Sequence, residues 1–114
     1  MIDWKRVEEL RSEIGESGFA EVVELFWDEV EAILDRLPRD SGTQLESDLH
    51  FLKGSAWNLG FTDFGAHCQH GEKKAAQGRA AEVDLAYVTG QYYDTKAVFL
   101  ANLPTAPRRE PRVA

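Results

Sequence analysis

Apolar residues recur at spacings of three and four along most of the chain, which is the period of an α-helix. A first short helix is expected after Asp3, whose side chain can cap a helix start. Its apolar face consists of Trp4, Val7, Leu10 and Ile14. Gly15 and Gly18 then bracket a break, because glycine is a poor helix former.

The longest apolar stripe predicts a second helix over residues 19–37. The residues of this stripe are Phe19, Val22, Val23, Phe26, Val30, Ile33, Leu34 and Leu37. Pro38 ends the helix because proline lacks the backbone N–H that the next turn needs. A polar turn over residues 40–43 leads to a third helix over residues 45–59, which Gly60 terminates. Its apolar face consists of Leu45, Leu49, Leu52, Ala56 and Leu59.

A fourth helix is expected from a cap at Thr62 to about Gly78, and a fifth over residues 81–103. Residues 104–114 contain three prolines and no periodic apolar face, so we expect a disordered C-terminal tail. The pattern therefore predicts one all-α domain over residues 1–103. Four long helices with one apolar stripe each pack best as an up-down-up-down four-helix bundle. The additional short N-terminal helix would lie across one end.

Composition and charge narrow the class of protein. The chain has 114 residues, of which 43% are hydrophobic and 29% charged, as is ordinary for one globular domain. The 13 basic and 20 acidic residues give a net charge of −7, which disfavours nucleic acid and anionic membranes as partners. The single cysteine, Cys68, excludes an internal disulfide, and no signal peptide or long apolar run is present. We therefore expect a cytoplasmic protein.

His50 falls on the side of the third helix that faces away from its leucines. At about 100° per residue, it lies about 140° from the middle of the apolar face. Glu46, Lys53, Gly54 and Trp57 flank it on the same side. A glycine inside a helix costs about 1 kcal/mol relative to alanine, so Gly54 indicates that space is needed beside the imidazole.

The segment His50–Gly60, HFLKGSAWNLG, resembles the signature of histidine-containing phosphotransfer (HPt) domains of multistep phosphorelays. The resemblance covers residues 3–103, although outside this core it rests on helix lengths and stripe patterns. The family's fold, a four-helix bundle with an extra N-terminal helix, agrees with the pattern above. The sequence departs from the family at Ala56, where many members have a serine, and at Trp57, where a smaller residue is common.

The resemblance implies that His50 accepts a phosphoryl group from an aspartyl phosphate on a receiver domain and passes it to another receiver. A neutral imidazole suits this step, because its ordinary pKa of about 6.5 leaves a nucleophilic nitrogen at neutral pH. Lys53 would stabilise the charge of the phosphoryl oxygens, and Gly54 would give the partner clearance. The residues expected to contribute to partner docking are Glu46, Ser47 and Trp57.

The partners implied by the resemblance are response regulator receiver domains and a hybrid sensor kinase. The Mg²⁺ and the acceptor aspartate would belong to the receiver, so no cofactor is expected on this chain. The sequence contains neither a GxxxxGK[ST] loop nor a kinase-type GxGxxG loop, so we expect a phosphohistidine carrier without ATP-dependent kinase activity. We further expect an independent protein that is monomeric and binds its partners transiently.

Two other functions stay open from the residues alone. The first is a helical docking module that binds a receiver or a kinase without carrying phosphate. The second is a metal site, because His67 and His70 share a helix face and Glu72 is near. Such sites normally need three or four convergent ligands, and Cys68 points to a different side from His67, so we favour no metal and a core cysteine between two partly exposed histidines.

Overall fold

The structure is a computed structural model, and it describes residues 2–39 and 44–103. Over these residues it is all-helical apart from an isolated β-bridge, as the sequence pattern predicts. The four α-helices are α1 (Trp4–Arg36), α2 (Leu45–Leu59), α3 (Thr62–Ala76) and α4 (Leu85–Asn102). Short 3-10 turns follow α1 at Leu37–Arg39 and precede α4 at Ala80–Glu82. The predicted turn at 40–43 and the predicted tail at 104–114 lie outside the described residues.

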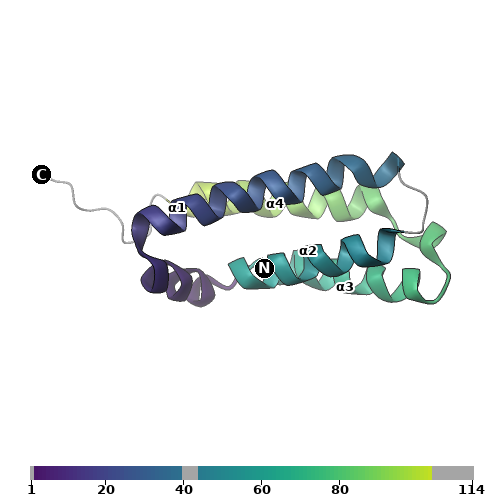
Figure 1. Ribbon diagram of the computed structural model, residues 1–114, viewed down its shortest axis with the longest axis horizontal. Helices are drawn as coiled ribbons and strands as arrows, with labels where there is room; N and C mark the ends of the chain where they lie inside the picture. Colours follow the sequence, from purple (N-terminus) through teal and green to yellow (C-terminus); the bar gives the residue numbers. More distant parts are fainter. Residues whose placement is uncertain (1, 40–43, 104–114) are drawn as a thin grey trace, which may run out of the picture.

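The helices form an antiparallel bundle in which each helix runs opposite to the one before it (Figure 1). Figure 1 shows α1 and α4 on one side of the bundle and α2 and α3 on the other. No helix within the described ranges is long and apolar enough to cross a bilayer. Because α1 and α4 lie together on the other side of the bundle, α2 and α3 share an outer surface that neither α1 nor α4 covers.

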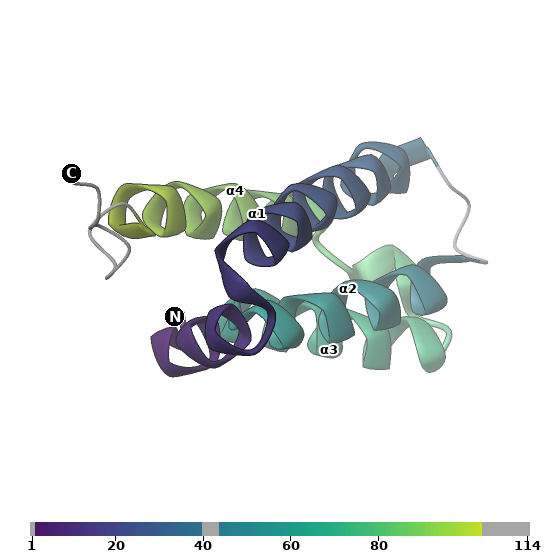
Figure 2. The same ribbon diagram turned by 60° about the vertical axis from the view of Figure 1, so that its left-hand side comes forward.

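Helix α1 is kinked at Gly15, which has φ 80° and ψ 167°. This left-handed φ is accessible to glycine and strained for other residues. Gly18 lies within the helix, so the predicted break at both glycines occurs only at the first. Figure 2 shows the segment before the kink turned away from the rest of α1. Arg6 holds this segment against the end of α2, donating from Nε to the Asn58 carbonyl at 2.8 Å and from Nη2 to Asn58 Oδ1 at 2.9 Å.

The core of the bundle contains a cluster of aromatic rings from α1, the start of α3 and α4. Its clustered rings are Phe26, Trp27, Phe61, Phe64, Tyr92 and Phe99. Tyr92 is fully buried, and its hydroxyl donates to Glu31 Oε2 at 2.7 Å. Lys96 Nζ also donates to Glu31 Oε2, and it lies 4.8 Å from the centre of the Trp27 ring. We refer to Glu31, Tyr92 and Lys96 as the Glu31 cluster, which joins α1 to α4.

The helix ends follow local signals. Gly60, at φ 98°, closes α2 as predicted, because its left-handed conformation directs the chain into α3. The predicted start of the last helix at residue 81 is wrong. Asp84 accepts a hydrogen bond from the backbone N–H of Tyr87 at 3.0 Å, so α4 begins after this cap, at Leu85.

Candidate functional site

His50 projects from α2 into solvent, with 67% of its side chain exposed. The apolar face of the same helix is buried in the bundle, which fixes the direction of the opposite face. The buried apolar residues are Leu45, Leu49, Leu52, Ala56 and Leu59. The outward direction expected from the helical period is therefore the direction that the structure gives to His50.

Glu72 on α3 contacts both His50 and Lys53. Its Oε2 atom lies 2.8 Å from His50 Nδ1, and its Oε1 atom lies 2.8 Å from Lys53 Nζ. Lys53 and Glu72 therefore form an ion pair through Oε1. Side chains of Lys53 and Glu72 are 18% and 17% exposed, so this pair is better shielded from solvent than His50. We refer to His50, Lys53 and Glu72 as the Glu72 cluster.

The electrostatics of the cluster define the state of the imidazole. Contact with Lys53 lowers the pKa of Glu72, partial burial opposes this, and the hydrogen bond with His50 lowers the pKa further. Glu72 is therefore ionised at neutral pH and can only accept hydrogen bonds. In the neutral imidazole the proton then lies on Nδ1, where Glu72 accepts it, and the lone pair lies on Nε2. Nε2 is the ring nitrogen that does not contact the carboxylate.

The surroundings of His50 are open. A Cβ atom added to Gly54, one turn further along α2, would meet nothing within 4 Å. Glu46 and Ser47 line a hollow of about 310 Å³ together with His50 and Glu72. Ser47 Oγ donates to the backbone carbonyl of Gln44 at 3.3 Å. The structure thus places Glu46, Ser47 and Gly54 around the imidazole with room for another molecule.

Trp57 lies beside the cluster and is 41% exposed. Its Nε1 donates to the carbonyl of Thr62 at 3.3 Å, and Lys53 Nζ lies 6.0 Å from the centre of its ring. A Cβ atom added to Gly65 would come within 2.2 Å of Trp57 Nε1. The indole is therefore held against α3 at a position that only glycine leaves open.

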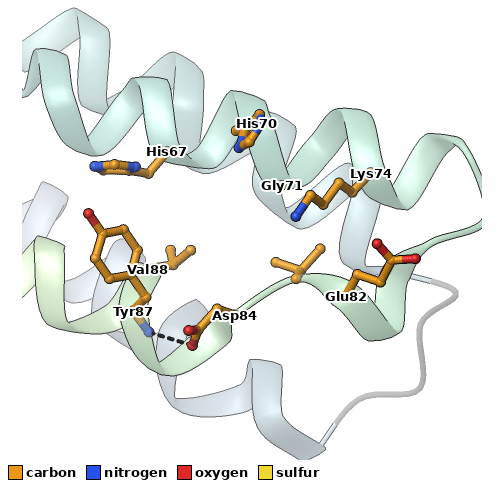
Figure 3. A pocket seen from close by; sticks show the side chains of 9 residues that line it. His67, His70, Gly71, Lys74, Glu82, Asp84, Tyr87 and Val88 are labelled. Atoms are coloured by element: carbon orange, nitrogen blue, oxygen red, sulfur yellow. Dashed lines mark hydrogen bonds between the residues drawn. The ribbon is translucent and has the colours of Figure 1, made fainter.

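The structure does not bring together the residues of the alternative metal site. Figure 3 shows His67 and His70 on the face of α3 that borders a cleft with Tyr87, whereas Glu72 contacts α2 instead. Burial, together with the nearby charge of Glu72, raises the pKa of the Cys68 thiol to about 12, so the group stays protonated. Across residues 2–39 and 44–103, no three potential ligands are close enough to hold an ion.

Glu72 is the site residue that sequence reasoning missed, because it was considered only with the two histidines. A signal was present in the sequence. Phe64, Cys68 and Glu72 are spaced by four, and the first two are fully buried. An acidic residue that continues a buried stripe needs a partner for its charge. Lys53, which the sequence places beside His50 on the neighbouring helix, is a basic residue that can be this partner.

Comparison with known families gives one match. The sequence model of the family described as Hpt domain matches residues 21–101. The match begins after the kink at Gly15, includes the whole Glu72 cluster and ends near the last turn of α4. No curated protein and no solved structure shows a significant match to the chain.

Proposed function

The chain belongs to the Hpt domain family, whose members take part in phosphotransfer in two-component relays, and from this premise we propose that His50 is its phosphoryl-carrying residue. In this proposal His50 accepts the group from the aspartyl phosphate of one receiver domain and passes it to an aspartate of another. The observation that supports it most strongly is the hydrogen bond between His50 Nδ1 and Glu72, because it leaves Nε2 unprotonated and exposed.

The transfer step follows from this arrangement. The Nε2 lone pair of His50 attacks phosphorus, the P–N bond forms, and the P–O bond to the receiver aspartate breaks. The aspartate leaves as a carboxylate, and no proton has to move from Nε2 because none is bound there. The proton stays on Nδ1 and is donated in a hydrogen bond to Glu72, whose negative charge stabilises the positive charge of the phosphorylated ring. The reverse step uses the same contacts, since a ring protonated at Nδ1 is the better leaving group.

Lys53 supplies positive charge next to the reaction. It lies one turn from His50 on α2 and is held by Glu72 in the resting state. In-line phosphoryl transfer depends mainly on positioning and charge stabilisation. The phosphoryl oxygens therefore compete with Glu72 Oε1 for the ammonium. The acceptor aspartate and its Mg²⁺ belong to the receiver, and the chain needs no cofactor for its own part.

The receiver docks on the exposed surface around His50. Phe51, next to the histidine, is 43% exposed, and Leu25 on the adjacent side of α1 is 54% exposed. Gly54, one turn beyond His50, allows close approach of the partner backbone. Glu46 and Ser47 line the hollow next to His50, and Trp57 lies beside Lys53. Because the reacting histidine lies within the docking surface, a response regulator and a hybrid sensor kinase bind in turn.

Phosphoryl transfer from a labelled receiver domain tests the proposal. The expected result is label on the wild-type chain that is acid-labile and alkali-stable, and no label on a His50→Gln variant. Gly54→Leu is expected to block transfer by obstructing the approach while it slightly raises helix stability. Label that persists in His50→Gln would refute His50 as the site. Binding of several receivers without any label would instead support a docking module.

A further inference from the structure

The hydrogen bond between His50 and Glu72 also bears on the ring after phosphorylation. Glu72 Oε2 lies 2.8 Å from Nδ1, the nitrogen that stays free when Nε2 carries a phosphoryl group. In a neutral ring phosphorylated at Nε2, the lone pair of Nδ1 faces this carboxylate and is repelled by it. A ring protonated at Nδ1 instead donates to Glu72, and a hydrogen bond to the charged form of a group favours that form. The contact therefore favours protonation of the phosphorylated ring.

Glu72 is kept charged and in position by Lys53. The ammonium lies 2.8 Å from Glu72 Oε1, and the two side chains are 18% and 17% exposed. Contact with Lys53 is also the main cause that lowers the pKa of Glu72. An ionised carboxylate only accepts hydrogen bonds. Glu72 thus accepts from the ring across the neutral and alkaline range, and its limited exposure reduces competition from water.

The other charged side chains around the imidazole have different contacts. Glu46 is exposed and lines a hollow of about 310 Å³ together with the ring, Ser47 and Glu72. Towards α1, Asp48 pairs with Arg36 at 2.9 Å. The Nδ1 proton therefore responds mainly to Glu72, whose carboxylate lies 2.8 Å away, whereas Glu46 adds negative charge to the same hollow.

We propose that Glu72 keeps phosphorylated His50 protonated at Nδ1 at neutral and mildly alkaline pH, and that this makes the folded carrier a short-lived phosphoryl donor. This role of Glu72 rests on the proposed function, because it requires the phosphoryl group on Nε2 of His50. Phosphohistidine is stable in alkali, since the group that leaves an unprotonated ring is an imidazolate. In the folded chain Glu72 provides at neutral pH the protonated ring that otherwise forms in acid. Strong alkali unfolds the chain and removes the contact, so the alkali-stable label described above is still expected.

Water then competes with a receiver for the phosphoryl group. In hydrolysis a water oxygen bonds to phosphorus, the P–N bond breaks, and its electron pair returns to Nε2. The ring leaves as a neutral imidazole with its Nδ1 proton still donated to Glu72, and one proton of the water passes to a phosphoryl oxygen. The side chain of His50 is 67% exposed and borders the hollow, so water reaches it. Glu72 is thus a positioning residue, and its effect is that the carrier loses its phosphoryl group unless a donor refills it.

The lifetime of the phosphorylated wild-type chain tests the proposal. Potassium phosphoramidate loads the full chain without a receiver, and phosphorus NMR follows the decay between about pH 6 and about pH 9. In the folded chain the decay rate should stay nearly constant up to mildly alkaline pH. In the same chain unfolded in urea, where His50 and Glu72 separate, the rate should fall as the pH rises and be at least about tenfold lower at about pH 8. Equal rates in the folded and the unfolded chain would overturn the proposal.

A pair of variants separates the contact at Nδ1 from the charge of the hollow. Glu72→Gln, loaded in the same way and checked for folding by circular dichroism, should show the declining pH profile of the unfolded chain. Glu46→Gln is the matched control, since it removes the same charge from the same hollow, and it should keep the wild-type profile. Equal profiles in the two variants would overturn the proposal.

The outcomes distinguish the two proposals. Absence of label on the wild-type chain would refute His50 as the carrier and with it the role of Glu72. Label on His50 with a wild-type pH profile in folded Glu72→Gln would refute only the role of Glu72. If Glu72→Gln does not fold, the comparison of folded and unfolded wild-type chain decides alone.

Discussion

Two glutamates on opposite sides of the bundle make the same pair of contacts. Glu72 binds Lys53 and His50 between α2 and α3, and Glu31 binds Lys96 and Tyr92 between α1 and α4. Each glutamate thus contacts the ammonium of a lysine and the polar atom of a ring side chain. The pKa of each is lowered, and for Glu31 the hydrogen bonds from Lys96 and Tyr92 outweigh the opposing effect of burial.

The difference lies in where the ring is. Tyr92 is fully buried, and burial, with the charge and hydrogen bond of Glu31, raises the pKa of its phenol so that it stays protonated. The side chain of His50 is 67% exposed, and Nδ1 is the ring nitrogen that contacts Glu72. The same carboxylate–lysine pair therefore links two helices on each side, and under the proposed function the pair between α2 and α3 also orients a nucleophile. The two clusters differ in the exposure and chemistry of the third group, and this difference is what makes the Glu72 cluster the candidate site.

The first comparison replaces each of the two glutamates by glutamine and measures the rate of phosphoryl transfer, where we expect the largest difference between the clusters. Glu72→Gln should slow phosphoryl transfer about 100-fold, because an amide can donate to Nδ1 and so select the wrong imidazole tautomer. Glu31→Gln should leave transfer unchanged and lower the free energy of unfolding by about 1–2 kcal/mol. Single-turnover transfer rates and urea unfolding measure the two effects. Equal transfer rates in the two variants would remove the functional distinction between the clusters.

The second effect concerns the close approach of α2 and α3 beside the Glu72 cluster. Gly65→Ala should lower the free energy of unfolding by about 1–3 kcal/mol, because its methyl group would displace the Trp57 indole. Gly54→Ala is the matched control, since it adds the same methyl group where nothing is within 4 Å. The control should gain up to about 1 kcal/mol of stability from helix propensity. Urea midpoints that move in the same direction for both would show that Trp57 is not held as described.

A smaller change in the free energy of unfolding distinguishes the two rings. Tyr92→Phe removes the hydroxyl that donates to Glu31 and should cost about 1 kcal/mol of unfolding free energy without slowing transfer. His50→Gln should abolish transfer and leave the urea midpoint nearly unchanged, because the side chain is mostly in solvent. A loss of transfer in Tyr92→Phe that exceeds its loss of folded protein would couple the two sides of the bundle.

The helices could be predicted from the sequence because their stripes and end signals are local. Pro38 and Gly60 correctly place the ends of two helices. The start of α4 was wrong by several residues, since Ala81 and Val83 fit the helical period while the cap at Asp84 decides where the helix begins. Gly18 is the opposite kind of error, because the sequence predicts a break there and the residue lies inside α1.

The site was predictable on α2 and not across the helix interface. One helical period places His50, Lys53 and Gly54 on a common outer face. Glu72 comes from α3, and its pairing with His50 depends on how α2 and α3 rotate against each other. No local pattern fixes that rotation. It follows from close contacts such as Trp57 on Gly65, which become visible only in the packed structure.

The smallest effect is on the dependence of stability on pH. Glu72 and Glu31 each have a pKa below the ordinary value of 4.5 in the folded chain. The folded state then binds these protons less readily than the unfolded state, so each group contributes stability that is complete above the ordinary pKa. That contribution is lost as the pH falls below the ordinary value and through the lower folded pKa. Glu72→Gln and Glu31→Gln should each reduce this loss of unfolding free energy at acid pH, as measured by urea unfolding. Glu24→Gln changes the net charge equally on the exposed side of α1 and should retain the wild-type dependence on pH.

Lys53 gives a second test, because Glu72 owes its lowered pKa mainly to this residue. Lys53→Ala should reduce the dependence of unfolding free energy on pH as Glu72→Gln does, and a wild-type dependence in that variant would contradict the ion pair.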